Sequence, residues 1–133
     1  MRHTQSILAV VALVLGLVVT SAFAAGLDVN IVGLKDGVVH PDPKLGPVVI
    51  VSVKPSDFQL KDFTKATDIN DHEGHIHIWL DNQSFNTLTS EPVWVFGGVK
   101  PGRHTLNVEL VHNNHTPLTP DVKKTITFTM AQN

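Results

Sequence analysis

The sequence predicts an all-β fold after residue 25, on three observations. Apolar and polar residues alternate with period two in several short segments, as they do in strands with one buried face. Valine, isoleucine, threonine and phenylalanine are common in these segments, and glycine, proline, asparagine and aspartate separate them. About seven such segments at short, regular spacing favour an immunoglobulin-like antiparallel β-sandwich over a barrel.

The first part of this region contains three strand segments. Residues 27–31 alternate between apolar and polar, and a glycine-containing turn at 33–37 follows. A short segment at 38–39 precedes a stretch that is too rich in proline for a central strand. Residues 47–53 are almost continuously apolar, which predicts a strand buried on both sides. Residues 54–74 are expected to form a polar loop with room for a short helical turn.

The second part contains the remaining strands, which turn residues separate. The expected strands span 75–81, 85–88, 93–96, 103–111 and 122–130, with a loop at 113–120. Asp81-Asn82 and Gly97-Gly98 are typical turn residues and close two of these strands. The segment 103–111 is long and alternates regularly, which predicts a central strand.

Residues 1–24 have the three parts of a secretory signal peptide. A positively charged start at Arg2 precedes an apolar run at 7–19, and small residues then lead to Ala24. The run is shorter than the roughly 20 residues that a membrane span needs, although a retained anchor is the alternative. We expect cleavage after Ala24, which leaves one domain at 25–133 in the periplasm or outside the cell.

The composition excludes several classes of function. The chain has no cysteine, which rules out disulfides, thiolate metal ligands and c-type haem attachment. Its 10 basic and 12 acidic residues form no clustered basic face, so nucleic acid is not an expected partner. No second long apolar segment follows, so we expect no membrane contact after signal cleavage. The eight histidines are the one unusual feature.

Two groups of histidines make up the candidate site. His75 and His77 alternate with Ile76 and Ile78, so strand geometry places both imidazoles on the outer surface and both isoleucines in the core. In a sandwich of this type the strand 75–81 neighbours 103–111 in antiparallel orientation, which brings the loop after residue 111 close to the pair. The candidate metal ligands are His75, His77, His115, His112, Glu109 and His72.

This ligand set predicts a function but leaves alternatives open. Imidazole and carboxylate without thiolate suit a copper or zinc ion. The sequence therefore predicts a secreted protein that binds a divalent transition metal for carriage or resistance. One alternative is a non-catalytic adhesion, envelope or assembly module that binds a periplasmic or extracellular protein or a glycan. Another is a metal-dependent enzyme, although no serine has the sequence context of a nucleophile and no catalytic residue is predicted.

His104 is interpreted differently from the other histidines. It shares the apolar face of its strand with Leu106 and Val108, which predicts a place at the rim of the core. We therefore expect its ring nitrogens to be hydrogen-bonded locally.

Three segments form a recurring pattern. Residues 73–81 (EGHIHIWLD), 100–106 (KPGRHTL) and 109–118 contain Gly-His-x-His, Pro-Gly-x-His-Thr-Leu and Asn-x-His-x-Pro-Leu. They resemble secreted bacterial and archaeal immunoglobulin-like domains of unknown function over roughly residues 72–122. The resemblance implies the fold and secretion but no established activity. The positions that match its motifs are His75, His77, His104 and His115.

A weaker likeness is to the small periplasmic copper-binding β-sandwich proteins. Periplasmic copper–zinc superoxide dismutase carries a similar Gly-x-His-x-His strand, but its cysteines and its histidine-rich zinc loop have no counterpart in this sequence. The methionine-rich or N-terminal histidine ligands of the copper-binding proteins are also missing. A dismutase activity is therefore not predicted.

Overall fold

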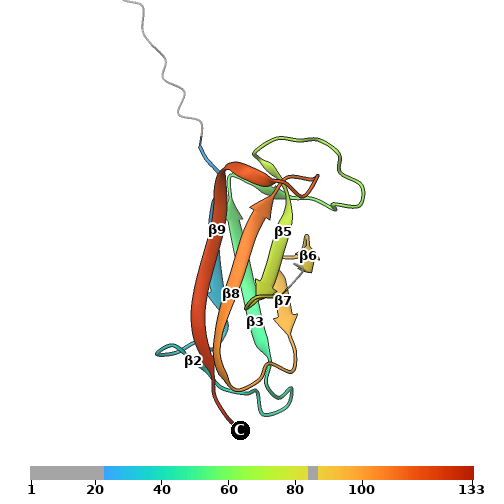
Figure 1. Cartoon of the computed structure of the whole chain (residues 1–133). Coiled ribbons are helices and arrows are strands. Elements are labelled where there is room, and N and C mark those ends of the chain that lie inside the picture. Colours follow the sequence, from blue (N-terminus) through green and yellow to red (C-terminus); the bar gives the residue numbers. More distant parts are fainter. Residues whose placement is uncertain (1–22, 84–86) are drawn as a thin grey trace, which may run out of the picture.

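The described part of the chain consists of strands and the loops between them (Figure 1). The computed structural model describes residues 23–83 and 87–133, so the predicted signal peptide falls almost wholly outside the described residues. The strands are β1 (Gly26–Ile31), β2 (Val38–Val39), β3 (Val49–Ser56), β4 (Gln59–Leu60), β5 (Glu73–Leu80), β6 (Thr87–Thr89), β7 (Val93–Phe96), β8 (Gly102–Val111) and β9 (Pro117–Met130). The all-β class is therefore confirmed for these residues, and none of them forms a helix long and apolar enough to cross a membrane.

The strands form two sheets. One has the order β1-β3-β7, and the other has the order β2-β9-β8-β5-β4, with β6 also paired to β5. The pairs are antiparallel except for the short parallel contacts of β2 with β9 and of β4 with β5. As predicted, the histidine strand β5 pairs antiparallel with β8, and His75 lies opposite Val111 while His77 lies opposite Glu109.

The two sheets bury one shared core. Val49, Val51 and Val53 of β3 face this core from the smaller sheet. Ile76 and Ile78 of β5 face it from the larger sheet and are fully buried, which confirms the predicted core face of β5. Apolar side chains on alternate positions thus leave the histidines of β5 on the opposite face of the sheet.

Two local predictions differ from the structure, and a third is met in part. The strand β3 is buried on one face only, because Ile50 and Ser52 point away from the core and stay half-exposed. The segment after β3 contains the expected helical turn, in which Lys65 N and Ala66 N both donate to Asp62 O, but it also contains the two-residue strand β4. The expected loop at 113–120 is shorter, because β9 already begins at Pro117 and pairs there with the end of β8.

Candidate metal centre

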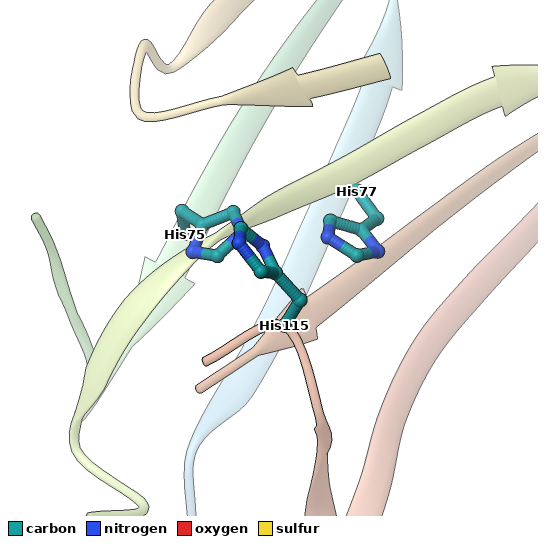
Figure 2. A group of neighbouring side chains, drawn as sticks. All are labelled: His75, His77 and His115. Atoms are coloured by element: carbon teal, nitrogen blue, oxygen red, sulfur yellow. The ribbon is translucent and has the colours of Figure 1, made fainter. Parts of the chain in front are cut away.

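The strand β5 and the hairpin between β8 and β9 bring three histidines together. His75 and His77 lie on the outer face of β5, next to the end of β8. His115 belongs to the hairpin of residues 112–116, which joins β8 to β9 and is closed by a backbone hydrogen bond from His112 N to Thr116 O at 2.8 Å. His115 adopts a φ of 68°, and its side chain turns toward the pair on β5 (Figure 2).

The three imidazoles are close enough to share one ion. One nitrogen of each ring lies within 4.8 Å of one nitrogen of each of the others. His115 Nδ1 and His75 Nε2 lie 2.9 Å apart. Tetrahedral coordination with metal–nitrogen bonds near 2.0 Å would place ligand nitrogens about 3.3 Å apart, so small side-chain movements suffice to form the site.

A covering loop, residues 61–72, packs over His75, and this contact contradicts one prediction. The ring of Phe63 lies 4.8 Å from that of His75 and 6.1 Å from that of His115, measured between centroids. His75 is 0% exposed, His77 is half-buried and His115 is exposed. The expectation that both strand histidines lie at the surface is therefore wrong for His75, because this loop packs over the outer face of β5.

Burial keeps the two strand histidines uncharged. Burial, followed by the nearby charges of His77 and His115, lowers the pKa of His75 to about 4. Burial, followed by the charge of His115, also lowers the pKa of His77. Both rings are therefore neutral at pH 7, the state in which imidazole nitrogen binds a metal.

Gly74 allows β5 to approach the end of β8 closely. A Cβ atom at this position would lie 1.8 Å from the carbonyl oxygen of Val111 and 3.0 Å from the ring of Phe58. The residue before His75 must therefore be glycine, or β5 must shift away from the hairpin that carries His115. Gly74 is the glycine of the Gly-His-x-His motif, so the motif itself is the sequence signal for this role.

Two other predicted ligands lie outside the three-histidine group. His112 directs Nε2 to Asp71 Oδ1 at 2.7 Å and Nδ1 to Thr116 Oγ1 at 3.0 Å, so both ring nitrogens are engaged. His72 is exposed, and its Nδ1 lies 3.1 Å from the carbonyl oxygen of Asp57. The hairpin folds back on itself, so it presents His115 rather than His112 to β5.

Glu109 also lies outside the group, although it is opposite His77 on β8. Its carboxyl group interacts with that of Asp121 on β9. Burial, followed by the hydrogen bond and the charge of Asp121, raises the pKa of Glu109 to about 7, while the charge of Lys123 acts in the opposite direction. The structure therefore pairs this carboxyl group with a second acid and not with the imidazole cluster.

His104 lies near the other end of β5, in a contact of a different kind. Its Nδ1 is 2.7 Å from Asp81 Oδ2, and its Nε2 is 2.7 Å from the carbonyl oxygen of Lys100. The ring also packs on Phe128, with 5.6 Å between the centroids. As predicted, both ring nitrogens are hydrogen-bonded locally, and the residue connects the turn after β5 with the start of β8.

Comparisons with protein-family models, with curated proteins and with solved structures give no match for this chain. The resemblance to secreted immunoglobulin-like domains therefore stays a prediction, and the candidate site has to be judged from its own geometry.

Proposed function

We propose that the protein binds one divalent transition-metal ion, copper or zinc, through His75, His77 and His115, for metal carriage or resistance. The observation that carries the proposal is the convergence of three imidazoles, one nitrogen from each, within 4.8 Å. Neutral imidazoles suit both ions, and three protein ligands leave one position for water or a further ligand.

The ring of His75 lacks the hydrogen bonds to oxygen that hold a structural histidine. His75 is fully buried, and its Nδ1 has no hydrogen-bond partner among the described residues. Its other nitrogen faces the ring of His115. A bound cation would replace this imidazole–imidazole contact with metal–nitrogen bonds.

The surroundings close one side of the cluster. The ring of Phe63 packs against His75 and covers that side with an apolar group. A metal-dependent enzyme, one of the alternatives from the sequence, would use the same three imidazoles together with the open fourth position.

We also propose that residues 1–24 are a signal peptide and that the domain works in the periplasm or outside the cell as an immunoglobulin-like sandwich. The charged start, the apolar run and the exit at Ala24 support export. Two mostly antiparallel sheets with one shared core are consistent with the sandwich.

Calorimetric titration of the purified protein with Zn(II) and with Cu(II) tests the metal site. We expect one ion per chain, and at least about tenfold weaker binding in the His77→Ala and His115→Asn variants. Asparagine is chosen at position 115 because it tolerates the left-handed backbone there. The matched control is His40→Asn, which changes an exposed histidine outside the cluster. Affinities that stay equal to wild type in both cluster variants would refute the proposed site.

A further inference from the structure

We infer that His112 is a positioning residue, which holds the ligand His115 in place and joins its hairpin to the covering loop. The inference rests on the proposed function, because it concerns how one of the three metal ligands is oriented. His112 is 9% exposed and is not part of the imidazole cluster. Its ring contacts both the hairpin of residues 112–116 and the covering loop.

Within the hairpin, His112 takes part in the bonds that set its shape. Its backbone N donates to Thr116 O at 2.8 Å, and its carbonyl oxygen accepts from His115 N at 2.9 Å. Its ring Nδ1 lies 3.0 Å from Thr116 Oγ1. His115, in its left-handed conformation, thus lies between His112 and Thr116, and the contact of the His112 ring with Thr116 connects these two residues.

Across the site, the same ring contacts the covering loop. Nε2 of His112 lies 2.7 Å from Asp71 Oδ1, and Asn113 Nδ2 donates to Asp68 O at 2.7 Å. This loop carries Phe63, whose ring packs against His75 and His115. The side chain of His112 therefore links the hairpin that carries His115 to the covering loop that packs over His75.

The chemistry of the contact fits a supporting role. Because a carboxylate only accepts hydrogen bonds, Nε2 of His112 carries a proton and donates to Asp71. With Nδ1 directed at Thr116, neither nitrogen is available for a metal ion. Loss of residues that orient metal ligands typically weakens metal binding by about 10- to 100-fold.

A double-mutant cycle tests the inference. Affinities for Zn(II) and Cu(II) are measured for wild type, His112→Ala, His115→Asn and the double variant. We expect His112→Ala to weaken binding about tenfold when His115 is present, and less than about twofold in the His115→Asn background. A purely structural role would give the same loss in both backgrounds, and that result would overturn the inference.

Two further variants keep the test decisive. Asp71→Asn removes the charged acceptor at an exposed position, so it repeats the cycle if His112→Ala does not fold. His104→Asn breaks the other histidine–aspartate pair and should lower stability without changing metal affinity.

The outcomes separate the proposed function from the inference. If wild type binds neither ion, the proposed function fails and this inference with it. If wild type binds and His115→Asn weakens binding but the cycle is additive, only the inference fails.

Discussion

The two ends of β5 use histidine in opposite ways. At its start, His75 and His77 face a third imidazole, and the closest contact is nitrogen to nitrogen. Just beyond its end, Asp81 and the carbonyl oxygen of Lys100 occupy both nitrogens of His104. The two arrangements lie on the same sheet, roughly 20 Å apart, because each residue of a strand adds about 3.3 Å between His75 and Asp81.

The difference in partners sets the charge of the imidazoles. At His104, burial alone would lower the pKa, but the hydrogen bond and charge of Asp81 and the carbonyl of Lys100 outweigh it and raise the pKa. Both nitrogens of this ring donate to oxygen, which requires the imidazolium form. At His75, burial and neighbouring imidazoles lower the pKa to about 4. The charged His104 therefore stabilises the fold through its hydrogen bonds, whereas the neutral His75 and His77 remain suited to binding a cation.

The largest expected effect is stabilisation of the folded protein by a metal ion bound to the three histidines. At a free ion concentration 100 times the Kd, binding to the folded state adds about 2.7 kcal/mol. For a domain of this size that corresponds to an increase in Tm of about 10 °C. Thermal unfolding with and without Zn(II) or Cu(II) measures it. We expect the same increase in His104→Leu and most of it to disappear in His115→Asn; an equal increase in His115→Asn would contradict the comparison.

A matched pair of substitutions compares the two ends in the absence of metal. We expect His104→Leu to lower the free energy of unfolding by about 1–2 kcal/mol, because it breaks a charge-assisted hydrogen bond. His75→Leu removes a buried nitrogen without a hydrogen-bond partner, so we expect an unchanged or slightly higher free energy of unfolding. Urea unfolding of the metal-free proteins at pH 7 measures both. Equal losses in the two variants would mean that His75 is a structural residue.

The third effect is the pH dependence of the metal-free protein. His75 binds a proton more weakly in the folded state, so its contribution is lost as pH falls from the ordinary value of 6.5 toward about 4. His104 binds a proton more tightly when folded, so its contribution is complete below 6.5 and is lost as pH rises through its raised pKa.

Unfolding free energies across this pH range, for wild type and the two leucine variants, test these signs. The acid-side slope should be shallower in His75→Leu and the alkaline-side slope shallower in His104→Leu. Slopes that change on the opposite sides would contradict the assigned protonation states.

Sequence periodicity predicted the face on which the histidines of β5 lie, and the expected sandwich topology predicted the pairing of β5 with β8. Alternation determines the face, and the antiparallel register then brings the residues after Val111 near His75. Loop geometry was not predictable in the same way. The turn within residues 112–116 decides that His115 reaches the cluster while His112 turns to Asp71. The covering loop has no periodic pattern, so the burial of His75 under Phe63 had no sequence signal.

The most direct test of the central claim is X-ray absorption spectroscopy of the metal-loaded protein, with Zn(II) and with Cu(II), because it counts the imidazole ligands around the ion. The structure predicts one bound ion with three imidazoles at about 2.0 Å in wild type and two in His115→Asn. His40→Asn should give the wild-type spectrum. A first shell without histidine nitrogen, or one that is identical in wild type and His115→Asn, would contradict the account.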